Sequence, residues 1–309
     1  MKVVIAGGTG FIGTRLISQL ISSGDSVTLL TRSGRVPQAF NEKVTAQPWD
    51  GKTAGNWMKV IDGADAVINL CGEGIAQKRW SKKQKTLLRS SRLEPTRAIV
   101  QAIQSAQVKP QVLINASAVG FYGSVPEEEV DESRVQGRGF LADLCADWEA
   151  SAREVETMGV RLVFPRIGIV LGPGQGALQK MIPPFNFFIG GPLGSGQQWF
   201  PWVHVQDVAN MILFAMKKSS ISGPINVCAP YPVRMHEFCG TLGRILNRPS
   251  WLPVLPVILR LALGEMAEML LCGQKAIPRK ALKNGFKFRY SFLETAMISI
   301  LSSDSLKGL

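Results

Sequence analysis

The sequence predicts an α/β protein built on a doubly wound, mostly parallel sheet, with a smaller and mainly helical lobe towards its C-terminal end. Three observations support this prediction. An apolar strand at residues 3–6 runs into a glycine-rich turn and then into a helical segment. Strand and helix signals alternate from there to about residue 230, as such sheets require. After residue 230, and from residue 172 to 200, that alternation is lost.

The glycine turn gives the first functional prediction. Residues 3–6 are apolar on both faces, and Gly7, Gly10 and Gly13 follow at G-x-x-G-x-x-G spacing. Gly7 allows the turn, Gly10 lets the backbone approach a pyrophosphate, and Gly13 lets the helix expected at 11–23 pack closely. The N–H groups and positive dipole end of this helix face the phosphates. We expect a Rossmann domain whose dinucleotide cofactor contacts Gly7, Thr9, Gly10, Phe11, Ile12 and Gly13.

The end of the second strand, at residues 26–31, narrows the choice of cofactor. An NAD site would place Asp or Glu there to bind the ribose 2′-hydroxyl. This chain has Arg32 instead, with Arg35 close by. A guanidinium binds a 2′-phosphate, and a hydrogen bond to a charged group contributes about 1.5–3 kcal/mol, roughly 10- to 100-fold in affinity. The sequence favours NADP(H); the alternative is a solvated loop arginine.

Length, charge and cysteine content describe an ordinary enzyme-sized chain. Its 309 residues suffice for one large α/β domain, or a main domain with a smaller one. The formal net charge of +12 suits anionic ligands, or weak unspecific attraction to nucleic acid and anionic membranes. Five cysteines without a C-x-x-C pair argue against a disulfide framework and a zinc site, so we expect no metal and a reducing compartment.

The prediction of the cellular location rests on two kinds of segment that are not expected in this sequence, a membrane span and a cleaved signal. No stretch of about 20 residues is free of charges or proline breaks, so no membrane span is expected. The N-terminus is a core strand that continues into its turn, so it is not expected to be a cleaved signal. Together these observations predict a cytoplasmic protein.

The remaining elements follow in order along the chain. Strands are expected at 44–47, 66–70, 112–115, 160–164 and 225–227, and helices at 95–105 and 140–158. The apolar segment 252–271 is expected to be a buried helix. Residues 1–230 are predicted to form the NADP-binding domain and 231–309 a small substrate-side domain, with 172–200 contributing to the substrate lobe. Ligands bind such sheets at the carboxyl ends of the strands.

Several motifs along most of the chain point to a family. Those typical of a wide superfamily are Gly7-Gly-Thr-Gly-Phe-Ile-Gly13, Tyr122-Gly123, Arg166 with Gly172, and Val203-His-Val-Gln-Asp207. More distinctive ones are Asn69-Leu-Cys-Gly-Glu73, Arg79-Trp80, Ser91-Arg92, Ser117-Ala-Val-Gly-Phe-Tyr-Gly123, Asp147-Trp148-Glu149, and the stretches 190–202 and 271–278. The chain resembles an extended short-chain dehydrogenase/reductase, in the atypical, epimerase-like branch whose substrate is unassigned.

The resemblance implies further cofactor contacts and an oligomeric state. Besides the glycine turn, it implies that the cofactor is contacted by Thr31, Arg32, Leu70, Cys71, Gly72, Arg92 and Ile169. Extended members often pair long helices between subunits, so a homodimer is one expectation.

The chain departs from that superfamily at the catalytic pair. Typical members use Tyr-x-x-x-Lys, in which the tyrosine transfers the proton and the lysine lowers its pKa. Here the residues four positions after the three tyrosines are Pro126, Met235 and Glu294, so the pair is absent. Positioned acid–base catalysis contributes typically about 10²- to 10⁴-fold. Another group must supply the proton, or redox turnover must be slow.

Ser117 and Tyr122 are the candidates for catalysis. Ser117 stands at the carboxyl end of the fifth strand, where the superfamily keeps a hydroxyl that polarises the substrate carbonyl; the alternative is a plain turn serine. Tyr122 could transfer a proton if a nearby cation helped it, or could be a packed aromatic. Cys145 is expected to be buried and inert. His204 is expected to make a structural hydrogen bond, with titration near neutrality as the alternative.

Two charged runs are most simply explained as solvated surface, and the first of them also allows functional interpretations. Residues 78–92 carry seven basic side chains and no acidic one. This run could be a rim that attracts phosphates, with Arg92 at a helix start, or a nucleic-acid patch with Trp80 stacking on bases, but a solvated helix face explains most of it. No nucleic-acid-reading motif accompanies it, so no specific nucleic-acid partner is expected. The acidic run 127–132 is expected to be a solvated loop.

Two functions from different classes remain open at this point. One is an NADP(H)-dependent oxidoreductase or epimerase-like enzyme that acts on a small carbonyl or hydroxyl compound. The other is a protein that senses NADP(H) with little or no turnover, which the missing Tyr-x-x-x-Lys pair favours. Hydride transfer needs an open pocket over the nicotinamide, whereas a sensor could fill that space with side chains such as Trp148.

Overall fold

The central sheet is parallel and doubly wound. The computed structural model describes residues 1–40 and 43–305. In these ranges eight strands form one sheet in the order β13-β8-β5-β4-β1-β2-β3, with β6 beside β8. The strands are β1 (Lys2–Ala6), β2 (Ser26–Thr31), β3 (Val44–Pro48), β4 (Ala66–Asn69), β5 (Val112–Asn115), β6 (Ser117–Ala118), β8 (Arg161–Ile167) and β13 (Gly223–Val227). Because the order reverses between β1 and β4, the predicted Rossmann topology is confirmed. Sheets of this kind bind their ligands at such a reversal.

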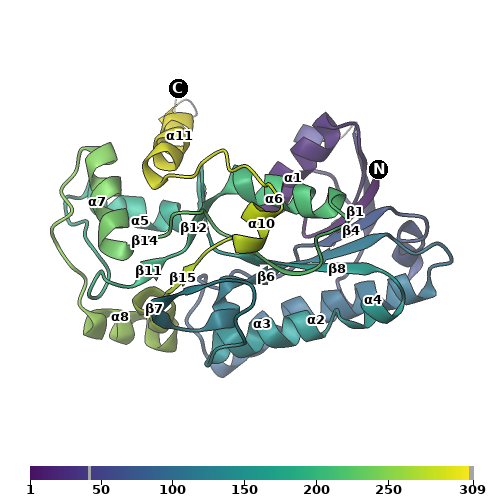
Figure 1. Ribbon diagram of the computed structural model, residues 1–309, viewed down its shortest axis with the longest axis horizontal. Helices are drawn as coiled ribbons and strands as arrows, with labels where there is room; N and C mark the ends of the chain where they lie inside the picture. Colours follow the sequence, from purple (N-terminus) through teal and green to yellow (C-terminus); the bar gives the residue numbers. More distant parts are fainter. Residues whose placement is uncertain (41–42, 306–309) are drawn as a thin grey trace.

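Two helical layers cover the sheet. One face carries α2 (Lys82–Ser105), α3 (Phe140–Ala150) and α4 (Glu154–Thr157), and the other carries α1 (Phe11–Ser22) and α6 (Val205–Lys217) (Figure 1). Neighbouring strand residues point to opposite faces, so Ile5 packs in the core with α1 and α6, whereas Val4 packs in the core under α2. This burial on both sides explains why the strands are apolar throughout.

Two helices differ from their predicted bounds. Helix α2 begins at Lys82, well before residue 95, because the Ser81 hydroxyl caps it by accepting a hydrogen bond from Gln84 N (3.2 Å). Pro95 therefore lies inside the helix, where the packed sheet face outweighs the loss of one backbone hydrogen bond. The predicted helix 140–158 is interrupted, since α3 ends at Ala150 and α4 starts at Glu154.

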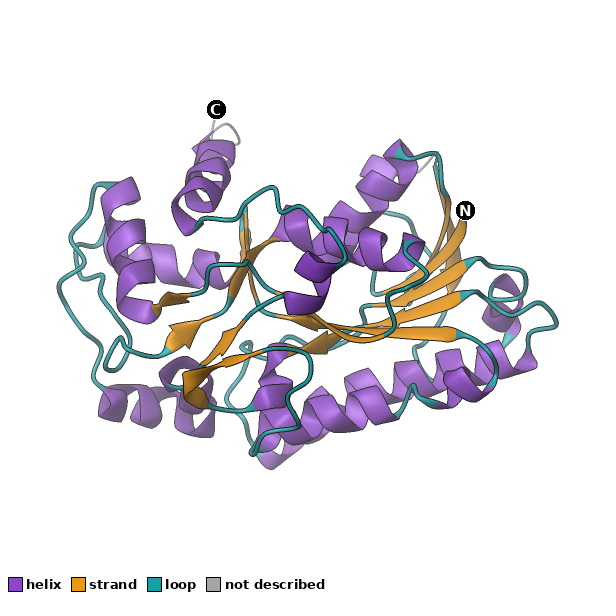
Figure 2. Cartoon of the chain, in the orientation of Figure 1, coloured by secondary structure: helices purple, strands orange, loops and turns teal. Residues whose placement is uncertain are grey.

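A second lobe forms beyond the carboxyl ends of the strands (Figure 2). Its helices and short strands are β9 (Ile169–Gly172), β10 (Gln175–Gly176), α5 (Ala177–Asn186), β11 (Trp199–Phe200), β12 (Trp202–His204), β14 (Val233–Arg234), α7 (Met235–Leu246) and α11 (Leu293–Ser305). Apart from β10, whose two residues are exposed, they share one apolar core, which includes Phe185, Trp202, Phe238 and Ile300. The lobe thus combines chain segments from before and after residue 230, and a domain boundary there stays a prediction.

The acidic run and the segment 252–271 both differ from what the sequence predicts. The acidic run is not a solvated loop: it forms most of β7 (Val125–Val130), which pairs in parallel with β15 (Gln274–Ala276). The segment 252–271 is not a buried helix either. It contains α8 (Pro256–Leu263) and α9 (Glu268–Leu271), and Val257 and Leu261 of α8 are 57% and 75% exposed. A short helix, α10 (Arg279–Lys283), follows β15.

Candidate functional site

The glycine turn between β1 and α1 is shaped by close backbone contacts. A Cβ on Gly7 would lie 2.7 Å from the carbonyl carbon of Leu70, and one on Gly13 would lie 2.5 Å from Gly8 Cα. At Gly10 the space is open, since a Cβ there would meet only Gly7 O, at 3.4 Å. Gly10 is also the N-cap of α1, and no side chain caps it. The first N–H groups of the helix are therefore available to a phosphate.

The other predicted turn contacts lie around this opening. Thr9 is exposed, and Phe11 and Ile12 are half-buried in the first turn of α1. The ring of Phe11 packs against the second lobe, because a Cβ on Gly172 would lie 2.6 Å from it. The turn is thus held on one side by the loop after β4 and on the other by β9.

Arg32 follows β2 at the same edge of the sheet. The strand pairs in parallel with β1, so its end lies beside the glycine turn. Thr31 is half-buried, with its hydroxyl 3.3 Å from Ser33 Oγ, whereas Arg32 is exposed. Its guanidinium makes no hydrogen bond or ion pair with the described residues. This arrangement fits a cation that binds the 2′-phosphate of the cofactor.

The loop after β4 is tied down by buried polar groups. Asn69 Oδ1 accepts a hydrogen bond from Cys71 N (3.1 Å), and Asn69 Nδ2 donates to Asn115 Oδ1 (2.7 Å). Leu70 and Cys71 are half-buried here, and Gly72 is exposed. Burial raises the pKa of the Cys71 thiol to about 12. Leu70 and Cys71 lie directly against Gly7, and Gly72 follows them, so these three predicted contacts form a wall beside the glycine turn.

Arg92 lies in the middle of α2, not at a helix start, and its guanidinium faces this wall. Nη2 donates to Glu73 O (3.0 Å) and Nη1 to Leu88 O (2.9 Å), and the cation lies 5.2 Å from the Trp148 ring centre. Burial lowers its pKa below the usual arginine value. Ile169, the other predicted contact, starts β9 and donates its N–H to Pro201 O (2.8 Å).

Ser117 and Tyr122 belong to one buried network of hydrogen bonds. Ser117 Oγ donates to Glu149 Oε1 (2.7 Å), and Arg166 holds the same carboxylate through Nε (2.8 Å) and Nη2 (2.9 Å). Arg166 Nη1 also donates to Tyr122 Oη (3.0 Å). Burial alone would lower the pKa of Arg166, but the carboxylate of Glu149 and the Tyr122 hydroxyl raise it above its usual value. Glu149 and Arg166 thus form a buried, doubly hydrogen-bonded ion pair.

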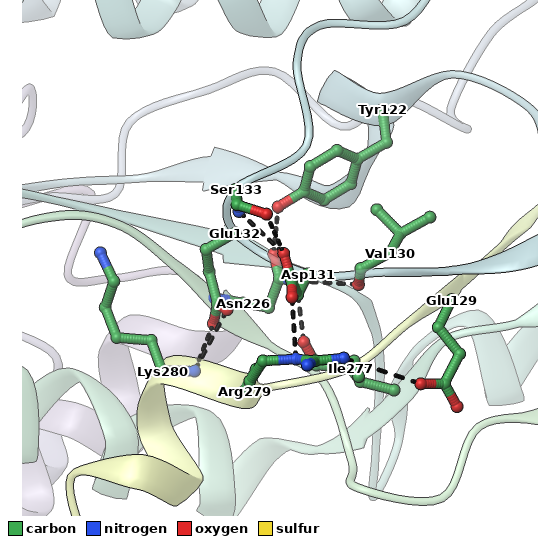
Figure 3. A network of polar contacts seen from close by, with 10 residues as sticks. All are labelled: Tyr122, Glu129, Val130, Asp131, Glu132, Ser133, Asn226, Ile277, Arg279 and Lys280. Carbon is green, nitrogen blue, oxygen red and sulfur yellow. Dashed lines mark hydrogen bonds and ion pairs between the residues drawn. The ribbon is translucent and has the colours of Figure 1, made fainter.

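The network continues into the C-terminal part of the chain (Figure 3). Tyr122 Oη donates to Asn226 Oδ1 (2.6 Å), and Asn226 Nδ2 donates to Ile277 O (2.9 Å). The Glu132 carboxylate accepts hydrogen bonds from Asn226 N (3.0 Å) and Lys280 N (3.1 Å). The end of the acidic run is therefore where α10 attaches to the main sheet.

Ser117 and Tyr122, the candidate catalytic residues, are both buried, and this limits the chemistry that they can perform. Tyr122 is 1% and Ser117 2% exposed, and every polar atom of both side chains is engaged as described. Burial raises the pKa of Tyr122 well above 10 despite the Arg166 cation. This geometry favours the packed-aromatic interpretation of Tyr122. Burial likewise raises the pKa of Cys145 to about 12, which fits an inert thiol.

His204 makes a structural hydrogen bond, as expected. Its Nδ1 accepts from Gln206 N (3.1 Å) and so caps α6, and burial, with Arg15 and Arg289 nearby, lowers its pKa to about 4. The unfolded chain therefore binds a proton between pH 6.5 and 4 that the folded chain does not, and stability falls as the pH falls through that window.

A variant of this histidine measures the effect. His204→Asn keeps a side-chain acceptor for the cap but removes the titratable ring. When the pH is lowered from about 7 to about 5, we expect the free energy of unfolding to fall by about 2 kcal/mol less in this variant than in the wild type. Urea unfolding at the two pH values tests this. Equal losses in both proteins would show that His204 is not held neutral by the fold.

Comparison with known proteins identifies the family. A model described as the NAD dependent epimerase/dehydratase family matches residues 3–228. The chain belongs to this family. A domain of unknown function matches residues 256–300, which include α8 to α10. The resemblance to the epimerase-like branch is confirmed.

Relatives within the epimerase/dehydratase family match almost end to end. The SDR39U1 homologue of Arabidopsis thaliana, called chloroplastic, is 41% identical over 97% of this chain and 87% of its own length. YfhF of Bacillus subtilis is 40% identical over 98% of both chains. The crystal structure of human SDR39U1 with NADPH is 34% identical and covers 97% of this chain and 99% of its own, with a TM-score of 0.87. The last of these supports the prediction of NADP(H).

Several residues that organise this site were given no role from the sequence, although Glu73, Glu149 and Arg166 stand in the family motifs and Glu132 in the acidic run. They are Glu149, Arg166, Asn226, Glu132 and Glu73. A usable signal was present for Arg166, which follows the apolar residues 162–165 of β8, where a charge is retained only with a partner. Helix α3 carries Asp143 and Asp147 besides Glu149, so its composition does not distinguish Glu149. No helix in the described ranges is long and apolar enough to cross a bilayer.

Proposed function

We propose that this chain is an NADP(H)-dependent oxidoreductase or epimerase-like enzyme that acts on a small carbonyl or hydroxyl compound. The observation that supports this most strongly is the free guanidinium of Arg32 beside the open N-terminus of α1. The two features offer one site for a pyrophosphate and one for a 2′-phosphate. NADPH in the human relative agrees with both.

The chain's own residues bind and orient the cofactor. The N–H groups after Gly10 bind the pyrophosphate, Arg32 binds the 2′-phosphate, and the wall formed by Leu70, Cys71 and Gly72 lies along the same edge. When bound, NADP(H) supplies or accepts a hydride, while the protein provides position and polarity.

Replacing Arg32 tests the cofactor assignment. Arg32→Ala is expected to weaken NADPH binding roughly 10- to 100-fold and to leave NADH binding nearly unchanged, because only NADPH carries the 2′-phosphate. The measurement is a fluorescence titration with each cofactor. Arg97→Ala removes another exposed arginine, on α2, and serves as the control. Equal weakening of NADPH and NADH in Arg32→Ala would contradict the assignment.

A sensor of NADP(H) is the second candidate function. It is favoured by the missing Tyr-x-x-x-Lys pair and by the burial of Trp148, which is 6% exposed and packs with Leu93 and Ala116 at the carboxyl edge. A screen of aldehydes and ketones with NADPH, and of alcohols with NADP⁺, separates the two functions by the change in NADPH absorbance. Turnover supports the enzyme, and tight binding without turnover supports the sensor.

Partners and location stay predictions. We propose a small-molecule substrate, no specific nucleic-acid partner, a homodimer and a cytoplasmic location. Light scattering of the purified protein tests the oligomeric state.

A further inference from the structure

The loop between β4 and α2 carries a carboxylate beside the cofactor site. Glu73 is two residues after Cys71, whose backbone nitrogen would lie 2.9 Å from a Cβ on Gly7. Two residues span at most about 7 Å between Cα atoms. Glu73 is therefore placed close to the glycine turn, on the same side of the sheet as the proposed cofactor contacts.

The main chain of Glu73 is fixed at two points. Its N–H donates to Ser91 Oγ (3.0 Å), and its carbonyl accepts from Arg92 Nη2 (3.0 Å). Arg92 in turn lies over the ring of Trp148, which is on α3, the helix where the superfamily's tyrosine would stand. Helix α2 thus holds the backbone of Glu73 at both points, and α3 supports Arg92, as a positioned reactive group requires.

The side chain of Glu73, in contrast, is free. It is half-buried, and its carboxylate makes no hydrogen bond or ion pair with the residues that the structure describes. The charge of Glu73 acts on Arg92, whose pKa it raises against the lowering effect of burial. The Glu73 carboxylate is therefore close enough to interact electrostatically with Arg92, but it makes no direct ion pair with it.

Other proton-carrying groups at this edge are already engaged. Glu149 is bound by Ser117 and Arg166, and Tyr122 lies between Arg166 and Asn226. Asp147 pairs with Arg89. Within the described ranges Glu73 is the acidic residue of this edge that remains available to a bound molecule.

We propose that Glu73 is the acid–base residue of this enzyme and takes the place of the missing tyrosine, with Arg92 as its positioning residue. The proposal rests on the proposed function. In the oxidation direction, the carboxylate removes the hydroxyl proton of the substrate while the hydrogen on the carbinol carbon leaves as hydride for NADP⁺. The products are a carbonyl compound, NADPH and a neutral Glu73, which returns its proton to water. Reduction follows the same path backwards.

Three variants test this role. Glu73→Gln keeps the size and removes the titratable group, Glu73→Asp keeps the group on a shorter chain, and Glu94→Gln changes an exposed carboxylate on α2 as a control. Each is titrated with NADPH and assayed with aldehydes and ketones, and with secondary alcohols and NADP⁺. We expect Glu73→Gln to lose about 10²- to 10⁴-fold in turnover with unchanged NADPH affinity, and Glu73→Asp to recover part of it. If Glu73→Gln retains its turnover, the proposed role of Glu73 is wrong, but the proposed function of the protein stands.

A labelling experiment adds a readout that needs no substrate. A carbodiimide with glycinamide modifies accessible carboxylates, and mass spectrometry locates them. We expect Glu73 of the wild type to be modified, to be protected by saturating NADP⁺, and Glu149 to stay unmodified throughout. Modification of Glu73 that NADP⁺ does not slow would overturn its placement at the cofactor site. Protection by NADP⁺ without turnover of any compound in the wild type would instead overturn the proposed function, and with it any catalytic role.

Discussion

Glu149→Ala is expected to destabilise the folded protein by about 3–5 kcal/mol, because it leaves the buried Arg166 charge without its partner. Arg166 is 3% exposed and reaches this carboxylate through two nitrogens. The hydroxyl of Ser117 would lose its acceptor as well. Urea unfolding followed by circular dichroism measures the loss.

Two control variants show whether the loss of stability in Glu149→Ala comes from the burial of the ion pair. Glu156→Ala breaks the exposed ion pair with Arg153 on the same side of the sheet, and is expected to cost less than about 1 kcal/mol. The double variant Glu149→Leu with Arg166→Met removes both charges, and is expected to recover much of the stability that Glu149→Ala loses. A loss in Glu149→Ala as small as that in Glu156→Ala would argue that the pair is solvated.

The sheet was predictable because its signals are local. Strands buried on both faces are apolar runs, and the glycine turn follows the first of them directly, so the strands at 26–31 and 112–115 have their predicted bounds. The cofactor edge was predictable for the same reason: Gly10 and Arg32 each follow a strand, and parallel strands end at one edge.

The features that the sequence did not reveal depend on distant contacts. The acidic run becomes β7 through β15, more than 140 residues further along the chain. The start of α2 was placed too late because Pro95 is a local breaker signal, whereas the packing of the helix on the sheet is not local. An apolar run such as that of α8 does not say whether anything covers it, and most of its apolar residues are exposed.

Gly10→Ala and Gly13→Ala are expected to separate cofactor binding from folding. Gly10 has ordinary extended angles (φ −79°, ψ 177°) and open space around its Cα, so alanine fits the folded chain. The new methyl group would stand where the pyrophosphate approaches. We expect NADPH affinity to fall about 100-fold or more, as for the loss of two hydrogen bonds to charged groups of about 1.5–3 kcal/mol each. The melting temperature of the free protein should hardly change.

Gly13→Ala, in contrast, should affect the stability of the free protein more than its affinity for NADPH. Its Cβ would lie 2.5 Å from the Cα of Gly8, so backbone must move and the free protein should lose about 1–3 kcal/mol of stability. Thermal unfolding without cofactor, set beside a fluorescence titration with NADPH, compares the two variants directly. If Gly10→Ala proved unstable while binding NADPH normally, the opening at Gly10 would be a packing feature of α1 and not a phosphate site. The difference between the two glycines thus tests whether this turn serves a ligand or only the close packing of the helix.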